Sequence, residues 1–150
     1  MRRRVVPVLL LAFLPLAGCG SEDDSASDAS TAEPSAVTAD DLDGSSYAST
    51  EVVGHELVEG TRVRLSFEDG VLAVSAGCNT MTAEYDVTGD QLAWSGEPAA
   101  TLMGCVEDVA AQDEWLTSLF RTGVVTARLV DGDLELTQDE VVLTLEPSDS

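Results

Sequence analysis

Three cysteines are the residues of this chain whose chemistry depends most on their surroundings. Cys19 closes the segment Leu16-Ala17-Gly18-Cys19, in which small residues precede a cysteine, as they do where an exported lipoprotein is cleaved and acylated. Cys78 and Cys105 lie much later in the chain. If Cys19 carries a lipid, the other two form an even number of thiols in an oxidising compartment, which favours a disulfide. We therefore predict lipidation of Cys19 and a bond between Cys78 and Cys105.

The predicted disulfide closes a loop of 27 residues (105 minus 78) and is expected to stabilise the fold by about 3 kcal/mol. An alternative is that Cys105, just before a predicted helix, is a reactive thiol that forms a redox switch with Cys78. Against this alternative, Glu107 and Asp108 disfavour a thiolate at that place, and the chain has no Cys-x-x-Cys pair. Both interpretations use the same two sulfurs.

The other reactive residues exclude several classes of function. The chain has no lysine, which removes Schiff-base chemistry and P-loop phosphate binding. Its sole histidine, His55, lies between two strand patterns and is interpreted as a loop residue. No Gly-x-Ser-x-Gly turn occurs, and two cysteines with one histidine do not supply the ligands of a typical zinc site. The sequence therefore predicts no enzyme, no catalytic residue, no metal and no cofactor.

Acidic residues dominate the charge of the chain. It has 28 Asp and Glu against 7 Lys and Arg, a net charge of −21. Loss of residues 1–18 would remove three arginines and leave a charge of 4 minus 28, or −24. Nucleic-acid binding requires a basic patch, so a nucleic-acid partner is excluded. Acidic runs such as Asp40-Asp41-Leu42-Asp43-Gly44 lack the later glutamate of a calcium loop and are predicted to be turns.

Residues 1–18 have the pattern of an export signal. Three arginines precede an apolar run over residues 5–16, which is shorter than a transmembrane helix requires. Residues 19–40 are then mostly Ser, Ala, Asp, Glu and Thr, a composition that buries too little apolar surface to fold. We expect an exported protein that is held at the cell membrane by lipid on Cys19, with a disordered acidic tether and a domain facing outside the cytoplasm.

Alternating apolar and polar residues follow this tether, which is typical of half-buried strands. The residues 106–122 are different, because Val109, Leu116, Leu119 and Phe120 recur at helical spacing and Gly123 is predicted to end the helix. The expected fold is α+β and mainly antiparallel β, a small barrel of seven or eight strands with one amphipathic helix over an opening. Strands are predicted at residues 45–53, 62–67, 71–76, 81–87, 92–94, 124–130, 134–137 and 141–145.

Several short motifs follow one another along the chain: Gly77-Cys78-Asn79, the strand around Tyr85, the hairpin at Gly89, Thr101-Leu102-Met103-Gly104-Cys105 and Gly132-Asp133-Leu134-Glu135-Leu136. In this order they resemble the META domain, also called the HslJ-like domain. Two residues depart from the family pattern, since Ala83 stands where Gly is usual and Tyr47 where Trp is usual. The resemblance implies a META domain over residues 41–147, followed by a short tail at 148–150.

The first of these motifs is predicted to form a sharp corner between two strands. Gly77 permits a positive φ, and the side chain of Asn79 bonds readily to nearby backbone. The segment around Thr101 and Met103, which leads into the helix, is expected to lie against this corner.

The resemblance implies a non-enzymatic envelope lipoprotein linked to stress tolerance, with no reaction to transfer. We expect it to bind an envelope protein or a peptidoglycan-associated partner from its place at the membrane. A second hypothesis is a carrier of a small apolar molecule inside the barrel, although the abundant Leu and Val are enough to fill that interior. The aromatic residues are predicted to be core rather than ligand-stacking residues: Tyr47, Tyr85, Trp94 and Trp115.

Overall fold

The computed structural model describes residues 33–149, so the predicted signal peptide and Cys19 lie outside the described residues. Within residues 33–149 no helix is both long and apolar enough to cross a membrane. The elements, in chain order, are β1 (Ser35–Ala36), α1 (Ala39–Leu42), β2 (Ser46–Val53), β3 (Arg64–Glu68), β4 (Val71–Ser75), β5 (Thr80–Thr88), β6 (Gln91–Trp94), β7 (Ala99–Ala100), α2 (Glu107–Thr122), β8 (Val125–Val130), β9 (Asp133–Gln138) and β10 (Val141–Pro147).

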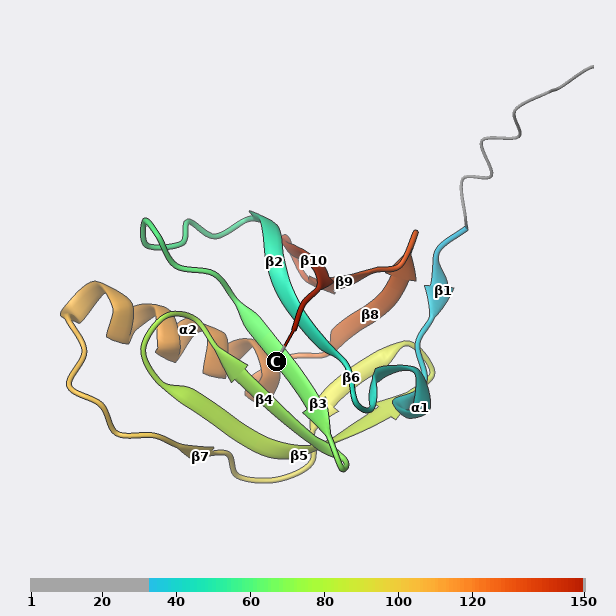
Figure 1. The fold of residues 1–150 in the computed structure, drawn as a ribbon, viewed down its shortest axis with the longest axis horizontal. Coiled ribbons are helices and arrows are strands. Elements are labelled where there is room, and N and C mark those ends of the chain that lie inside the picture. The colour runs from blue at the N-terminus through green and yellow to red at the C-terminus, as the bar shows by residue number, and fades with distance from the viewer. Residues whose placement is uncertain (1–32, 150) are drawn as a thin grey trace, which may run out of the picture. The chain divides into compact units, whose positions relative to one another are not determined.

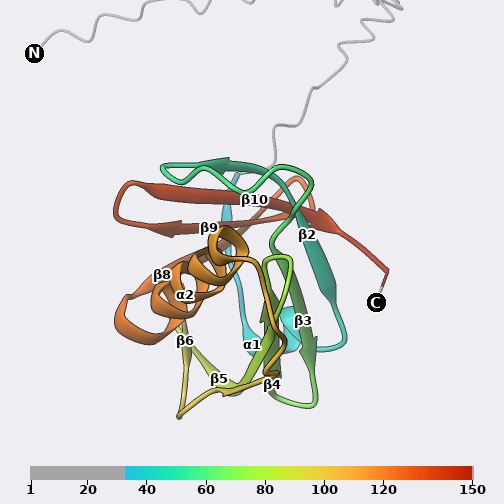
Figure 2. The same ribbon diagram turned by 90° about the vertical axis from the view of Figure 1, so that its left-hand side faces the viewer.

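Eight of the strands close into an antiparallel barrel (Figure 1). The order around the barrel is β8-β6-β5-β4-β3-β2-β10-β9, and the pairing of β9 with β8 completes the ring. The helix α2 lies at the end of the barrel that faces the viewer in Figure 2. Closure leaves no free edge among these eight strands, which protects them from pairing with other chains. The predicted barrel with one main helix is confirmed.

Alternation along β3 and β4 shows how the sequence builds this barrel. Leu65 pairs with Val74 and Phe67 with Leu72, and all four side chains are almost completely buried. The intervening Asp69 and Gly70 both have positive φ, 52° and 75°, as a two-residue hairpin with the right-handed twist of the strands requires. The predicted strands therefore pair through the predicted turns.

The barrel interior is packed with large side chains. Phe67 is 1% exposed, and its ring makes edge-on contacts with Tyr47 and Tyr85, at centroid distances of 6.2 Å and 5.2 Å. From α2, Phe120 packs against Trp94 at 5.4 Å, and Leu116 is fully buried. Three of the four aromatic residues predicted to be core are therefore buried, whereas Trp115 packs against the core from its edge.

The end of α2 differs from the prediction. Gly123 follows the helix as expected, but its φ is −117°, so it is not a left-handed cap. Glycine is required here because there is no room for a side chain: a Cβ at this position would lie 1.3 Å from Nε2 of Gln138. That Nε2 donates to the carbonyl of Leu119 at 2.9 Å and satisfies one of the last carbonyls of the helix. A side chain on β9, and not the local backbone, therefore caps α2.

The folded domain extends beyond its predicted limits at both ends, into the predicted tether and the predicted tail. Ser35 and Ala36 pair with Leu129 and Arg128 of β8, and Val37 is 1% exposed. At the other end, the backbone N–H of Ser148 donates to Ser46 at 2.8 Å. The sequence did not predict this strand, because its attachment to the domain depends on two strand residues and one buried valine, which form no alternating apolar pattern. The folded domain therefore starts before residue 41 and includes Ser148.

The acidic run at residues 40–44 was predicted to be a turn. Its first part, as far as Leu42, instead belongs to the one-turn helix α1, whereas Asp43 and Gly44 form the predicted turn. Thr38 caps α1 through a capping box: its hydroxyl accepts from the N–H of Asp41, whose carboxylate accepts from the N–H of Thr38 at 2.9 Å. The hydrogen bonds from Thr38 lower the pKa of the Asp41 carboxyl. This cap fixes the entry of the chain into the barrel.

Replacing Thr38 by alanine is expected to lower the free energy of unfolding by about 1 kcal/mol, because the first turn of α1 loses its side-chain acceptor. Urea denaturation followed by tryptophan fluorescence measures the change. Thr38→Ser keeps the hydroxyl and serves as the control. Equal losses in both variants would contradict a capping role.

Candidate functional site

The motif Gly77-Cys78-Asn79 forms the corner between β4 and β5, as predicted. Gly77 has a φ of 121°, and a Cβ on it would lie 2.7 Å from Cγ2 of Thr61. Glycine is therefore required both by the backbone conformation and by the neighbouring side chain. The corner turns Cys78 and Asn79 toward the segment that precedes α2.

Cys78 and Cys105 form the predicted disulfide, with their Cα atoms 6.1 Å apart. Both residues are half-buried. The bond joins the β4–β5 corner to the chain just before α2, a link that the strand ladders do not provide. It holds the connection between β7 and α2, which has no other regular structure, against the barrel.

Asn79 is the centre of the hydrogen bonds around this bond. Its Oδ1 accepts from the backbone N–H of Met103 at 2.9 Å and from the hydroxyl of Thr101 at 3.1 Å. The hydroxyl oxygen of Thr101 in turn accepts from the N–H of Thr80 at 3.0 Å. The two motifs recognised in the sequence are therefore bound to each other, as expected.

The other side of Asn79 holds a residue that sequence analysis missed. The N–H and Nδ2 of Asn79 donate to Oδ2 of Asp113 on α2, at 2.9 Å and 3.0 Å. Nδ2 also lies 3.2 Å from Sγ of Cys105. Asp113 is only 6% exposed, and none of the donors among residues 33–149 pairs with its Oδ1. The sequence does contain a signal for this residue. Asp113 is three residues before Leu116, so a carboxylate lies on the apolar face of the helix, where it is expected to be buried.

Gln112 is the second buried polar residue of α2. Its Oε1 accepts from the N–H of Val58 at 2.6 Å, and its Nε2 donates to the hydroxyl of Thr61 at 2.8 Å and to the carbonyl of Ala76. Each amide group of Gln112 therefore has a partner, so its burial costs little. Gln112 connects α2 with the loop before β3 and with the end of β4.

Residues 40–150 match the META domain family. The chain belongs to this family. Two structures solved by NMR have the same fold. One is a protein 20% identical, with a TM-score of 0.57, covering 73% of this chain and 94% of that chain. The other, from Burkholderia xenovorans, is 16% identical, with a TM-score of 0.58, covering 75% of this chain and 87% of that chain. None of the curated proteins matches the chain.

Two other residues of the META-domain motifs, Tyr85 and Gly89, have structural roles in the core and in a turn. Tyr85 is buried in the core, and its hydroxyl donates to the carbonyl of Ala39 at 3.4 Å. Burial, with smaller effects of Asp43 and Asp40, raises the pKa of this hydroxyl. Gly89 has a φ of 67° and forms the turn between β5 and β6.

Three exposed apolar residues lie within three positions of Cys105 in the sequence, on the segment before α2. Leu102 is 98% exposed, Met103 64% and Val106 71%. Beside them a groove of about 510 Å³ runs between this segment and α2, with Met81, Leu102 and Ala110 among its lining residues. In Figure 1 the segment passes from β7 to α2 along the side of the domain away from β1. The disulfide and Asn79 thus present an apolar loop, here named the 101–106 loop.

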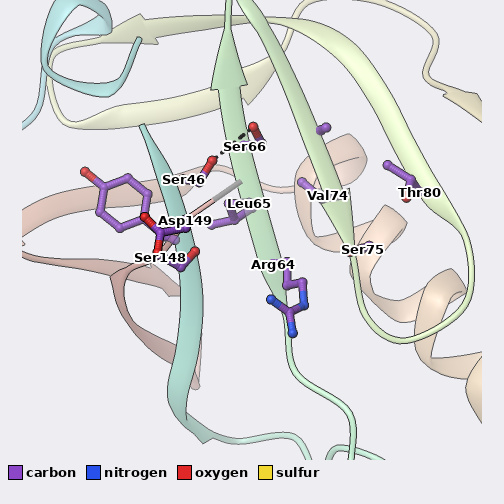
Figure 3. Close-up of a pocket in the computed structure, with 11 residues that line it drawn as sticks. Ser46, Arg64, Leu65, Ser66, Val74, Ser75, Thr80, Ser148 and Asp149 are labelled. Atoms are coloured by element: carbon purple, nitrogen blue, oxygen red, sulfur yellow. Dashed lines mark hydrogen bonds between the residues drawn. The ribbon is translucent and has the colours of Figure 1, made fainter. Parts of the chain in front are cut away.

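A second hollow lies over strands β2 to β5 (Figure 3). Its volume is about 260 Å³, and its walls include Arg64, Leu65 and the Ser46–Ser66 hydroxyl pair, whose oxygens are 3.2 Å apart. This volume lies below the roughly 300 Å³ at which small-molecule pockets begin. The hollow is open to solvent, and we assign it no ligand.

The sole histidine lies in a loop, as predicted, and its ring is stacked. The rings of His55 and Trp115 are 3.7 Å apart and parallel to within 3°. Because this contact removes water from the imidazole, the pKa of His55 lies below its ordinary value of 6.5. His55 therefore joins the loop after β2 to α2.

The depressed pKa gives stability a dependence on pH. As pH falls through about 6.5, the unfolded chain takes up the proton first, so the free energy of unfolding decreases. The decrease ends once His55 in the folded protein is also protonated. Proton NMR titration of the single imidazole, in the folded and the urea-unfolded chain, measures both pKa values. Trp115→Leu removes the stacked ring and is expected to bring the folded pKa closer to the unfolded one; equal values in the unaltered protein would contradict the prediction.

Proposed function

We propose that this META-domain protein is a non-enzymatic binding protein of the cell envelope, held at the membrane by lipid on Cys19, whose contact surface is the 101–106 loop. The observation that carries the proposal is the exposure of Leu102, Met103 and Val106 on a loop that is held in place from two sides. Its role is accessory, in tolerance of envelope stress.

The distribution of exposed apolar residues supports this surface. Residues 33–149 expose five large apolar side chains, and three of them lie in the 101–106 loop; the other two are Val53 and Val124. Contiguous exposed apolar side chains mark interaction sites, whereas single ones are ordinary. The disulfide and the bonds to Asn79 order this loop in advance, which reduces the entropy that binding would otherwise cost.

The charge around the loop indicates the chemistry of the partner. Glu107, Asp108 and Glu114 are exposed on the adjoining part of α2. A partner that presents apolar side chains together with basic groups is complementary to this surface. An envelope protein, or a protein associated with peptidoglycan, fits this description better than an anionic lipid surface, which the acidic domain repels.

The anchor is supported by sequence. Residues 1–18 carry the basic, apolar and small-residue regions of an export signal that ends at Cys19. Acyl chains attached there hold a protein at the membrane without a spanning helix. In this proposal the domain faces outside the cytoplasm.

Two alternatives have less support. A carrier needs space inside the barrel, but Phe67, Phe120 and several leucines fill its interior with almost no exposure. An enzyme needs an acid or base in contact with a substrate, and His55 instead lies flat against Trp115. The proposal therefore includes neither a ligand in the barrel nor a reaction.

Site-specific photo-crosslinking in intact cells tests the surface. A photoreactive amino acid at position 102 is expected to give one discrete adduct, and the same residue at position 53 to give none, since Val53 is exposed outside the loop. Equal adducts from both positions, or none from position 102, would remove the support for this surface.

Membrane fractionation tests the anchor. The unaltered protein is expected in the membrane fraction with incorporated radiolabelled palmitate, and Cys19→Ser in the soluble fraction without label. If Cys19→Ser remained membrane-bound to the same extent, the anchor would have to lie elsewhere.

A further inference from the structure

We propose that reduction of the Cys78–Cys105 disulfide converts this region into a binding site for Zn²⁺, with the two sulfurs and the carboxylate of Asp113 as ligands. One potential ligand atom from each of the three residues lies within 4.8 Å of the others. Cys105 belongs to the 101–106 loop, so this site adjoins the binding surface proposed above, but zinc binding to the reduced chain can be measured without any partner. It was not visible in the sequence, because the aspartate comes from α2 and the cysteines from two other segments.

Asp113 provides the observation that points to a cation. Its side chain is 94% removed from solvent, and Oδ2 is held by two donors from Asn79. Its Oδ1 is buried without a partner among the described residues. A buried carboxylate oxygen without a hydrogen bond is unfavourable, and coordination to a cation satisfies it.

In such a site Asn79 would orient the ligands without binding the ion itself. It fixes the carboxylate of Asp113 through Oδ2 and also lies 3.2 Å from Sγ of Cys105. Metal ligands are commonly oriented in this way by hydrogen bonds from a residue that does not itself bind the ion. Two of the three ligand residues are thus already oriented by one asparagine.

The chemistry needs a reductant, for which we name a dithiol. Two electrons from the dithiol break the Cys78–Cys105 bond, so that the protein gains two thiols and the reductant becomes a disulfide. Zn²⁺ then binds both sulfurs as thiolates and releases two protons, while Asp113 binds as a carboxylate. Thiolate ligands favour Zn²⁺ over Ca²⁺ or Mg²⁺, which prefer oxygen.

The surroundings allow the required movement and access. Two sulfurs about 2.3 Å from a tetrahedral ion are about 3.8 Å apart, so the cysteines must separate. Cys105 and Cys78 both lie outside helices and strands, Cys78 in the corner between β4 and β5. A hollow of about 390 Å³ has one of the three ligand residues, Cys78, in its wall, together with Arg62 and Arg64. The three ligands carry one more negative charge than Zn²⁺ neutralises, and two arginines line the same hollow as Cys78.

The experiment uses the full chain with Cys19→Ser, so that Cys78 and Cys105 are its only cysteines. The chain is reduced with a dithiol and then freed of it by gel filtration in anaerobic buffer. Titration with Zn²⁺ against a chromophoric chelator is expected to give one ion per reduced chain and none per oxidised chain. Co²⁺ in place of Zn²⁺ is expected to give the absorption of thiolate ligation. Zinc bound equally by the oxidised chain, or no zinc bound by a chain with two titratable thiols, would overturn the proposal.

Two variants on α2 test the aspartate. Asp113→Asn is expected to weaken zinc binding to the reduced chain at least about tenfold. Glu114→Gln removes an exposed carboxylate one residue away and is expected to leave the affinity unchanged. Circular dichroism of each oxidised variant shows that it is folded. Equal affinities of Asp113→Asn and the unaltered protein would exclude Asp113 as a ligand. If the reduced, otherwise unaltered protein showed no thiolate absorption with Co²⁺, the site as a whole would be excluded.

Discussion

Replacing Cys78 and Cys105 together by serine is expected to lower the free energy of unfolding by about 3 kcal/mol. The cysteines are 27 residues apart in sequence, and their bond restricts the unfolded chain accordingly. Urea denaturation of the oxidised protein and of the double variant measures the difference. The loss concerns the part of the domain that presents the 101–106 loop, so the loop is also expected to become more susceptible to limited proteolysis.

The reduced but otherwise unaltered protein is the matched control for this prediction. It should lose about the same stability as the double variant, because both lack the covalent bond while they retain the hydrogen bonds of Asn79 to Met103, Thr101 and Asp113. Cleavage should begin between residues 99 and 106, rather than in the hairpins of the barrel. A loss below about 1 kcal/mol would mean that the unfolded chain is already compact in this region.

Phe67→Ala is expected to cost about 3 to 5 kcal/mol, the largest effect of any single substitution considered. Its ring is 1% exposed and lies in the barrel between Tyr47 and Tyr85. Strands on both sides prevent the barrel from collapsing around the space that the ring leaves. Thermal and urea denaturation, followed by circular dichroism, measure the loss.

Leu102→Ala is the control for the aromatic substitution, because it also truncates a large apolar side chain. Leu102 is 98% exposed, so its change in stability should stay within about 0.5 kcal/mol. The same variant is expected to reduce partner binding without unfolding the protein. Similar stability losses for Phe67→Ala and Leu102→Ala would contradict the packed interior described above.

Local pattern was sufficient for most of the barrel. In β3 and β4, apolar residues alternate with polar ones, and the turn Asp69-Gly70 has the residues that a two-residue hairpin requires. The period of α2 is equally clear, and its predicted limits, residues 106–122, differ from Glu107–Thr122 by one residue. These features depend on neighbours in the chain, so they can be read without the fold.

Features that depend on distant residues were missed. Val37 carries no pattern of its own, and β8, which lies over ninety residues later, gives β1 its strand partner. Gly123 was interpreted as a backbone signal, but Gln138 on β9 is the reason that no side chain fits there. Asp113 interrupts an apolar stripe, and its meaning appears only when the β4–β5 corner is beside it.

The sequence by itself determined most of the strands, their turns, the helix and the membership of a family, because periodicity, glycine positions and short motifs are local properties. The pairing of Cys78 with Cys105 was predicted from the sequence on the expectation that the third cysteine, Cys19, carries lipid, and the structure shows the bond. Only the tertiary structure decided where the domain begins, which apolar residues are left exposed and which carboxylate lies beside the disulfide. Those properties arise from closure of the barrel, which brings the β4–β5 corner, the 101–106 loop and α2 together. The hydrogen-bond partners and the burial of Asp113 and Leu102 exist only after that closure.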